Sequence, residues 1–320
     1  MNNLLLTALA QVKTVAIAGH TRPDGDCTGS CMALYNYIIN NYKETKVDVY
    51  LEPIAGAYKV IKNTQAIKSS YDEEISYDLF IALDSSELKR LEGAGKYFIS
   101  ASKTICIDHH ISNNGFADEN HIVPESSSTC EVLYDLLEDQ KVNLDIAEAL
   151  YIGILSDTGC FRHSNTSGKT LNTVGRLISK GVRFSMLIDE VFYQKTFMQN
   201  QLLGRCLIES MLLLDGRCIV SVVSKEILDF YRAGSKDLEG VIDQLRVTKG
   251  VEAAVLLTET GPFSYKISMR SNGAVDVNKV ASYYGGGGHI LAAGSQMTGS
   301  KHDVINNLTL HIEEQLEKND

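Results

Sequence analysis

Aspartate and histidine side chains, the residue types that bind hard divalent metal ions, follow several short apolar segments of this chain. They are His20, Asp24 and Asp26 after segment 15–19, Asp84 after 79–83, Asp108, His109 and His110 after 104–107, and Asp157 after an apolar helical stretch. An oxygen-rich ligand set with some imidazole suits Mn²⁺ or Mg²⁺ better than a thiolate zinc site does. Two such ions, about 3.5–4 Å apart, are the usual apparatus for hydrolysing phosphate esters through hydroxide attack.

The apolar segments themselves predict where these side chains meet. Short apolar runs rich in β-branched residues, separated by helix-like stretches, are typical of buried parallel strands. In an open α/β sheet, the ligand site lies just beyond the carboxyl ends of such strands. We therefore expect an α/β fold with a parallel sheet and flanking helices, and the clusters at one edge of that sheet.

The pattern along the chain predicts two domains. The first half favours strands at 15–19, 47–51, 79–83 and 104–107, and helices at 26–41, 129–138, 145–155, 170–180 and, as one long stretch, 185–213. The second half favours strands at 218–223, 251–257 and 263–269, another after a glycine run, and helices at 237–248, 276–282 and 301–318. We place a catalytic domain at 1–182, a helical connector at 183–212 and a smaller α/β domain at 213–320.

Composition excludes some classes of protein. The net charge of −10 argues against a broad basic surface that grips long duplex nucleic acid, although short phosphorylated substrates remain compatible with it. No apolar run approaches the ~18 residues of a membrane helix, and the N-terminus lacks the basic region of a signal peptide. We expect a cytoplasmic protein with no membrane partner.

The seven cysteines are odd in number and irregularly spaced, which predicts free thiols in a reducing cytosol. A structural zinc at Cys27 and Cys31 is a weaker interpretation, because no second pair stands at zinc-finger spacing.

The glycine run 285–288 has two interpretations. Consecutive glycines form flexible turns, but backbone N–H groups of such loops also form concavities that bind anions. Arg270 on a preceding strand adds a forked donor set suited to a terminal phosphate. We expect an anion cradle, and the residues assigned to the substrate are Gly286, Gly287, Gly288, His289 and Arg270, with Arg162 either touching it or lying at the surface.

The order His-x-x-x-Asp-x-Asp, Asp, Asp-His-His, Asp resembles the DHH phosphoesterase superfamily. Gly285 to His289, followed by Ala292-Ala293-Gly294, is similar to the DHH-associated C-terminal domain. Length and domain pairing are most similar to the subfamily of nanoRNA exonucleases and phosphatases of 3′-phosphoadenosine 5′-phosphate (pAp).

The resemblance implies a role for each motif residue. His20, Asp24 and Asp84 would hold one ion, and Asp26, Asp84, His109 and Asp157 the second, so that Asp84 bridges them. His110 would contact the scissile phosphate or act as acid to the leaving oxygen, and Asp108 would orient the neighbouring histidines. Cys27-Thr28 departs from the small apolar residues usual after Asp26, and we expect this to affect helix packing or metal tuning.

The leading function is Mn²⁺-dependent hydrolysis of short single-stranded oligoribonucleotides, of pAp, or of both. A cyclic or linear dinucleotide phosphodiesterase is the alternative, and a nucleotide-binding sensor without catalysis is a second alternative of another class. An inorganic pyrophosphatase would carry lysine and arginine motifs in its second domain, and a processive exonuclease would carry further nucleic-acid-binding domains. The sequence leaves a homodimer open.

Overall fold

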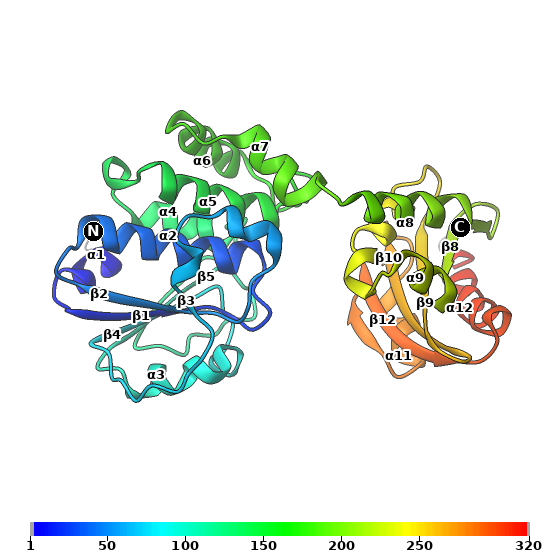
Figure 1. The fold of residues 1–320 in the computed structure, drawn as a ribbon, viewed down its shortest axis with the longest axis horizontal. Helices are drawn as coiled ribbons and strands as arrows, with labels where there is room; N and C mark the ends of the chain where they lie inside the picture. The colour runs from blue at the N-terminus through cyan, green and yellow to red at the C-terminus, as the bar shows by residue number, and fades with distance from the viewer. Residues whose placement is uncertain (1–2, 319–320) are drawn as a thin grey trace. The chain divides into compact units, whose positions relative to one another are not determined.

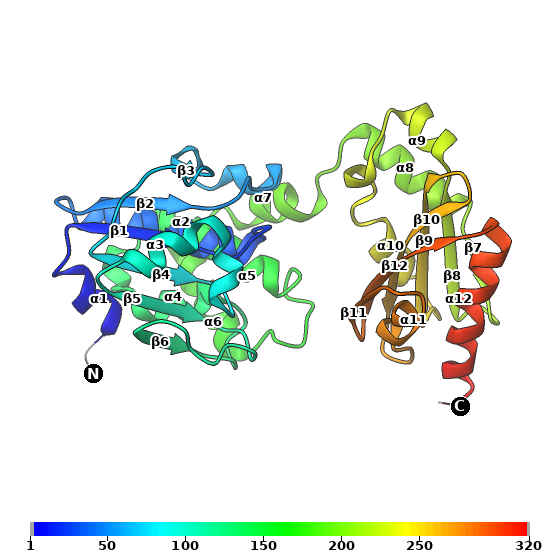
Figure 2. The ribbon, with the colours of Figure 1, turned by 90° about the horizontal axis from the view of Figure 1, so that it is seen from below.

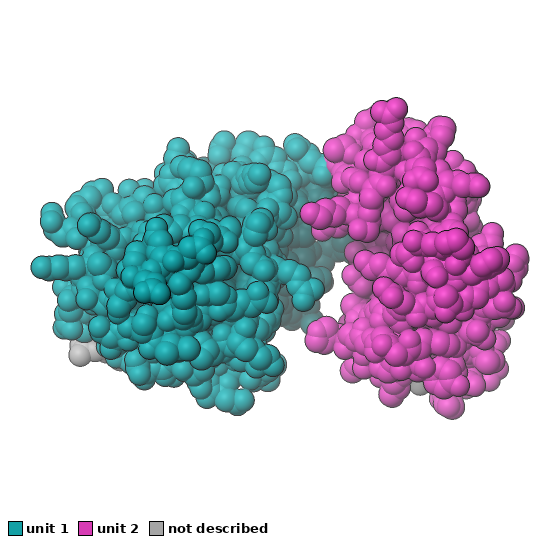
Figure 3. Space-filling view, turned by 60° about the horizontal axis from the view of Figure 1, so that its bottom comes forward, with its two compact units in different colours: residues 1–194 teal, residues 195–320 magenta. Residues whose placement is uncertain are grey.

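The structure, a computed structural model, describes residues 3–318 and consists of two compact units. Along the chain, the boundary between the units falls between Gln194 and Lys195, within the residues for which the sequence predicts a connector. Figure 3 colours the two units separately. Each unit has its own sheet and its own apolar core, and each is described by itself.

The first unit contains a six-stranded parallel sheet (Figures 1 and 2), which confirms the predicted fold class. Its order is β3-β2-β1-β4-β5-β6, with β1 Thr14–Ala18, β2 Lys46–Tyr50, β3 Ile67–Lys68, β4 Leu79–Leu83, β5 Thr104–Asp108 and β6 Glu119–Ile122. The chain moves outward from β1 in one direction, then returns to β4 and moves outward in the other. The crevice between β1 and β4 is therefore a topological switch point, where ligands of such sheets bind.

Helices cover both faces of this sheet (Figure 1). They are α1 (Leu4–Leu9), α2 (Gly25–Asn41), α3 (Gly95–Ser100), α4 (Thr129–Leu136), α5 (Leu144–Asp157), α6 (Gly168–Ser179) and α7 (Phe184–Ile188). Val15 and Ile17 pack in the core with α2 and α5, whereas Ala16 and Ala18 face α3 on the other side. This alternation is the period of two that a strand imposes on its side chains, and it leaves β1 buried on both faces.

Two glycines allow α2 and α5 to approach closely. A Cβ at Gly29 would lie 2.6 Å from the Ala149 carbonyl oxygen of α5. A Cβ at Gly153 would lie 2.8 Å from Asp26 Oδ1. A larger residue at Gly153 would therefore press directly on one of the predicted metal ligands.

The second unit has a mixed sheet with the order β11-β12-β10-β9-β8-β7. Its strands are β7 Met211–Leu213, β8 Cys218–Val223, β9 Ala253–Gly261, β10 Ser264–Ser271, β11 Gly287–His289 and β12 Ala292–Thr298, and its helices are α8 Phe197–Ile208, α9 Lys225–Tyr231, α10 Val241–Arg246, α11 Val277–Tyr283 and α12 Lys301–Leu316. Only the β8–β9 pair among these strands is parallel. Helices α11 and α12 pack on one face, and α8 to α10 on the other.

The long helix expected over 185–213 is wrong, because three local signals break it. Helix α7 passes into a π-helical turn at Asp189–Tyr193, and Gln194 is extended. Thr196 and Gln199 then form a capping box that starts α8 as a new helix. Met211–Leu213 pairs antiparallel with β8 as an edge strand.

The expected helix over 237–248 is interrupted at Gly240, whose φ of +81° lies in the left-handed region. A 3₁₀ turn, Ser235–Leu238, precedes this residue, and α10 follows it.

The glycine run is not a free loop. Gly285, with φ +71°, makes the turn after α11, and Gly287–His289 forms edge strand β11 against β12. A Cβ at Gly288 would lie 2.4 Å from the Ala292 carbonyl oxygen, so glycine is needed for the two strands to approach. An edge strand still presents one row of backbone polar groups outward.

Within residues 3–318, the structure contains no helix with both the length and the apolar character needed to span a membrane.

Candidate active site

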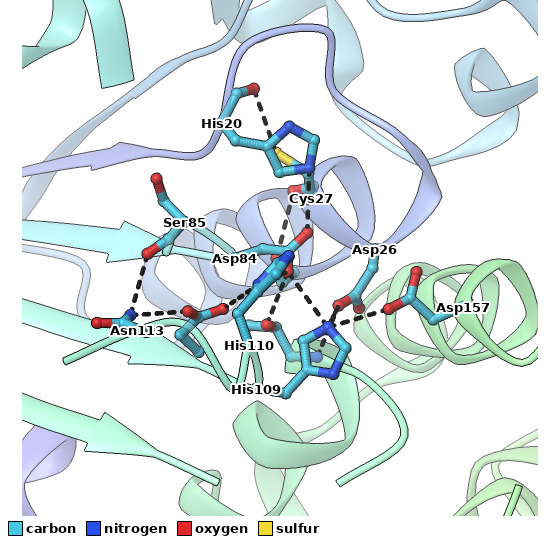
Figure 4. A network of polar contacts seen from close by, with 12 residues as sticks. His20, Asp26, Cys27, Asp84, Ser85, His109, His110, Asn113 and Asp157 are labelled. Atoms are coloured by element: carbon cyan, nitrogen blue, oxygen red, sulfur yellow. Dashed lines mark hydrogen bonds and ion pairs between the residues drawn. The ribbon is translucent and has the colours of Figure 1, made fainter. Parts of the chain in front are cut away.

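Five of the six residues predicted from the sequence to bind metal, all except Asp24, lie together near the carboxyl ends of β1, β4 and β5 (Figure 4). Asp84, directly after β4, occupies the centre of this group. Its Oδ2 lies 3.4 Å from His20 Nε2, and its Oδ1 lies 3.7 Å from His109 Nε2. One carboxylate thus faces two separate histidines with its two oxygens, which is the geometry of a bridging ligand.

Asp24 completes the cluster around His20. As the N-cap of α2, its Oδ1 accepts hydrogen bonds from the backbone N–H groups of Asp26 and Cys27. Its Oδ2 lies 3.7 Å from His20 Nε2. The helix cap therefore fixes one oxygen of Asp24 and directs the other toward His20.

The second cluster contains Asp26, His109 and Asp157, whose candidate ligand atoms lie within 4.8 Å of one another. His109 Nε2 is 3.1 Å from Asp157 Oδ2, at the last residue of α5, and 3.9 Å from Asp26 Oδ2. Asp26 is completely buried in the first turn of α2. Three elements distant in sequence thus contribute one ligand atom each.

Both histidines are oriented through their Nδ1 atoms. His20 Nδ1 lies 2.8 Å from the Thr21 carbonyl oxygen, and His109 Nδ1 lies 3.4 Å from that of Ser126. A ring that donates its Nδ1–H to a carbonyl keeps Nε2 as the metal-binding nitrogen. In both cases Nε2 is the atom that faces the carboxylates.

The N-terminus of α4 holds the two buried carboxylates. The backbone N–H groups of Thr129 and Cys130 donate to Asp26 at 2.6 and 2.9 Å, and Thr129 Oγ1 donates to Asp84 Oδ1 at 3.0 Å. The positive end of a helix dipole stabilises such negative charges. The sequence predicts the start of this helix at residue 129, but it did not predict these contacts to Asp26 and Asp84.

Asp84 has a strained backbone conformation. Its φ is +53°, in the left-handed region that a residue with a Cβ seldom adopts. Such a conformation costs on the order of 1–3 kcal/mol and is concentrated at functional sites, where the surrounding structure enforces it.

The titration of the cluster reflects its concentrated charge. Burial opposes protonation of His20, but hydrogen bonds to Asp24 and Asp84 outweigh it and raise the pKa to about 12. Burial likewise opposes protonation of His109, but Asp157, Asp26 and Asp84 raise its pKa to about 10. Burial, followed by the charges of Asp84 and Asp157, raises the pKa of Asp26 well above its usual range. The cluster of carboxylates therefore stabilises positive charge at this site, either as protons on its side chains or as bound cations.

His110 is placed by Asp108. His110 Nδ1 lies 2.7 Å from Asp108 Oδ1, while Asn113 Nδ2 donates to Asp108 Oδ2 at 2.7 Å. Burial would raise the pKa of Asp108, but these hydrogen bonds lower it overall. The carboxylate is thus held ionised and fixes the His110 ring. Asn113 was not among the predicted residues, and its place three residues after His110 gives no signal by itself.

A cavity of about 730 Å³ opens beside this cluster. His20 and Asp24 line it together with three cationic residues that we did not predict: Arg22, Lys89 and Arg90. No spacing pattern in the sequence relates Arg22 to the other two. Arg162 lies exposed after the left-handed residues Gly159, Cys160 and Phe161 that follow α5.

Arg270 and His289 belong to the second unit, where the sheet register aligns them. Arg270 of β10 is opposite Ala292 of β12, which is opposite His289 of β11. Residues directly opposite each other project to the same face, at about 4.8 Å per strand. Arg270 and His289 thus share one face, with the small Ala292 between them. Arg270 Nε also lies 3.3 Å from Asp243 Oδ1.

The donor set fits divalent metal ions. Within residues 3–318, the ion pairs of Asp26, Asp84 and Asp157 are all with histidines, so no described lysine or arginine is paired with these carboxylates. Each candidate group combines carboxylate oxygens with imidazole at spacings that one ion can span.

Metal binding should stabilise the first unit. We expect Mn²⁺ added to chelator-treated protein to raise its unfolding temperature, because an ion that binds only the folded state contributes about 2.7 kcal/mol at 100 times its Kd. Asp157→Asn should lose part of this gain, whereas Asp135→Asn, at an exposed position of α4, should retain it. Differential scanning calorimetry provides the measurement. Equal unfolding temperatures with and without Mn²⁺ in the wild-type protein would contradict the metal assignment.

Comparison with known proteins identifies two domains. Residues 14–154 match the model described as "DHH family, N-terminal domain", and residues 215–318 match the DHHA1 domain. The chain is 26% identical over 302 residues to the bifunctional oligoribonuclease and PAP phosphatase NrnA of Bacillus subtilis, covering 93% of each protein. It is 28% identical over 297 residues to the protein of the same name from Thermus thermophilus, covering 89% of this chain and 84% of the relative.

Among solved structures, an exopolyphosphatase-related protein from Bacteroides fragilis has a similar fold. The TM-score is 0.84 at 24% identity, over 98% of this chain and 94% of the other. This similarity concerns the fold alone. With a DHH domain followed by a DHHA1 domain, the chain belongs to the DHH family and is a hydrolase that acts on phosphate esters.

Proposed function

We propose that this protein uses two divalent ions, preferably Mn²⁺, to hydrolyse short oligoribonucleotides and pAp. The observation that carries the proposal is the position of Asp84, whose two oxygens face the His20 and His109 clusters separately. The relatives named as oligoribonucleases and PAP phosphatases support the choice of substrates.

The ligands divide between two positions in this proposal. His20, Asp24 and Asp84 hold one ion, and Asp26, Asp84, His109 and Asp157 hold the other. Bound there, the two ions would activate a water molecule for attack and offset charge on the phosphoryl group. The α4 N-terminus keeps Asp26 and Asp84 fixed, so that the ligand positions are organised before substrate arrives.

His110 acts on the substrate. Its Nδ1 is held by Asp108, so Nε2 is the nitrogen that faces the scissile phosphate. The ionised Asp108 stabilises the protonated imidazole, which raises the pKa of His110. A protonated Nε2 can then donate to a phosphoryl oxygen or give its proton to the leaving oxygen.

The cations around the cavity bind the remaining phosphates of the substrate. Arg22, Lys89 and Arg90 lie on the His20 side of the site, where they supply positive charge outside the metal positions. In the second unit, the face shared by Arg270 and His289 grips a phosphate away from the scissile bond, with the edge of β11 beside it.

Arg270→Ala and His289→Ala should weaken substrate binding more than they slow the chemical step of hydrolysis. A lost charge-assisted contact costs on the order of 1.5–3 kcal/mol, roughly ten- to hundredfold, and should appear mainly in KM for a trinucleotide. Arg246→Ala, at a cationic residue of α10 bonded to Asn272, is the control. Steady-state kinetics on a small phosphodiester without a distal phosphate should barely change. Equal losses on both substrates would contradict the assigned role.

Rates per RNA end should fall sharply between oligomers of two to five nucleotides and a 24-mer. The net charge of −10 offers no extended electrostatic path for a long strand, whose binding depends on many phosphate contacts. End-labelled RNAs of both lengths, with pAp and a cyclic dinucleotide in parallel, test the proposal. A 24-mer degraded processively, as fast as a trimer, would refute it, and a cyclic dinucleotide cleaved fastest would favour the dinucleotide alternative.

The proposal includes a cytoplasmic location. All seven cysteines are free thiols, which supports a reducing compartment.

A further inference from the structure

Cys27 places a sulfur atom in the cluster around His20. It directly follows Asp26 in the first turn of α2 and is completely buried. Its Sγ, a nitrogen of His20 and a carboxylate oxygen of Asp84 lie within 4.8 Å of one another. Figure 4 shows the sulfur beside the His20 ring. These three atoms alone form a group that one ion can span.

Gly19 makes room for this sulfur. A Cβ at residue 19, between β1 and His20, would lie 2.3 Å from Cys27 Sγ, a distance that no real side chain tolerates. Cys27 Sγ donates a hydrogen bond to the His20 carbonyl oxygen at 3.7 Å and lies beside the thiol of Cys31. The thiol therefore lies in the space that Gly19 leaves at the strand end, where its protein neighbours are a carbonyl oxygen and a second thiol.

We propose that Cys27 Sγ is a ligand of the ion at the His20 position, together with His20, Asp24 and Asp84. The inference rests on the metal centre of the proposed function and extends it. On binding, a sulfur–metal bond forms and the thiol proton passes to solvent. A thiolate ligand favours softer divalent ions such as Co²⁺, Zn²⁺ or Cd²⁺.

The two metal positions then differ in character. The His20 position combines sulfur, nitrogen and oxygen, whereas the position of Asp26, His109 and Asp157 offers oxygen and one imidazole. The first position should select a softer ion, and the second should take Mn²⁺ or Mg²⁺. One residue of the first turn of α2 thus gives the two positions different ion preferences, although Mn²⁺ can fill both.

The spectrum of the Co²⁺-loaded protein tests the sulfur bond directly. We expect a sulfur-to-cobalt charge-transfer band in the near ultraviolet for the wild-type protein. Cys27→Ser should lose the band. Cys31→Ser, equally buried one helical turn later but outside the ligand group, should keep it. A wild-type protein that binds Co²⁺ without the band, or a band lost only in Cys31→Ser, would overturn the inference.

Metal affinities give a second readout that does not depend on activity. Cys27→Ser should weaken Cd²⁺ binding at the tighter site by at least about tenfold, the lower end of the losses seen when groups supporting metal ligands are removed. Mn²⁺ affinity should change much less. Equal changes for the two ions in a competition titration would contradict a soft ligand.

The outcomes separate this inference from the proposed function. Binding of two ions without sulfur contact refutes only the role of Cys27, whereas failure to bind ions refutes the metal centre itself. X-ray absorption of the Co²⁺-loaded wild-type protein counts sulfur neighbours without any variant, so the test holds even if Cys27→Ser folds poorly. One sulfur per chain, averaged over the two cobalt ions, is expected, and none would overturn the proposal.

Discussion

Asp84→Asn should abolish nearly all hydrolysis while leaving the fold intact. The Asp84 carboxylate has one oxygen toward His20 and the other toward His109, so it would hold one cation with each. The asparagine amide has a single oxygen and no charge, so it cannot replace both contacts. Loss of a single group that stabilises transition-state charge typically costs about 100- to 1,000-fold, and a shared ligand should cost at least that much. The amide oxygen can still accept from Thr129 Oγ1, which preserves the local packing.

The measurement is kcat on a trinucleotide with Mn²⁺, together with circular dichroism and metal analysis. Asp135→Asn removes a carboxylate from the exposed face of α4 and should leave activity and metal content unchanged. Wild-type activity in Asp84→Asn would mean that the two clusters do not share a ligand.

His110→Ala should retain both metal ions and lose turnover. His110 is outside the groups around His20 and around Asp26 with Asp157, but it also forms a third possible metal group with Asp84 and His109. We expect the substrate role because Asp108 already holds its Nδ1 at 2.7 Å. Removal of a general acid typically costs about 100- to 10,000-fold in rate. Asp108→Asn should cost less, because the ring remains but loses its ionised partner.

Metal content and the pH profile separate the two roles. In Asp108→Asn the pKa of His110 should fall, since the Asp108 hydrogen bond is the largest cause that raises it. Activity that needs the protonated imidazole should then be lost at a lower pH than in the wild-type protein. A His110→Ala variant that loses a metal ion would instead identify His110 as a ligand.

The sequence predicted the elements of the site well because strands carry a strong local signal. The runs before His20, Asp84 and Asp108 are continuous and apolar, as strands buried on both faces must be. Parallel topology then brings their carboxyl ends to one edge without any knowledge of side-chain contacts.

The contacts around the ligands could not be predicted, because they depend on tertiary placement. The N–H groups of Thr129 and Cys130 reach Asp26 only because α4 begins beside α2, more than a hundred positions away in the chain. The cations Lys89 and Arg90 lie in a 3₁₀-helical segment, Leu88–Ala94, and line the same cavity as Arg22 through a placement that no periodicity encodes.

Two predicted elements were wrong because a local backbone signal opposes the average sequence pattern. Residues 185–213 carry apolar spacing compatible with one helix, but the Thr196 cap starts a new helix within them. Consecutive glycines predict a loop at 287 and 288, but pairing with β12 makes these residues a strand. In both places a local backbone feature overrides the average pattern.

Reconstitution of the chelator-treated protein tests the central claim most directly. Mn²⁺ is titrated into a known amount of metal-free protein, and the hydrolysis of an RNA trimer is followed at each addition. We expect no hydrolysis without metal and a plateau at two equivalents per chain. Hydrolysis that persists without metal, or that reaches its plateau at one equivalent, would contradict it.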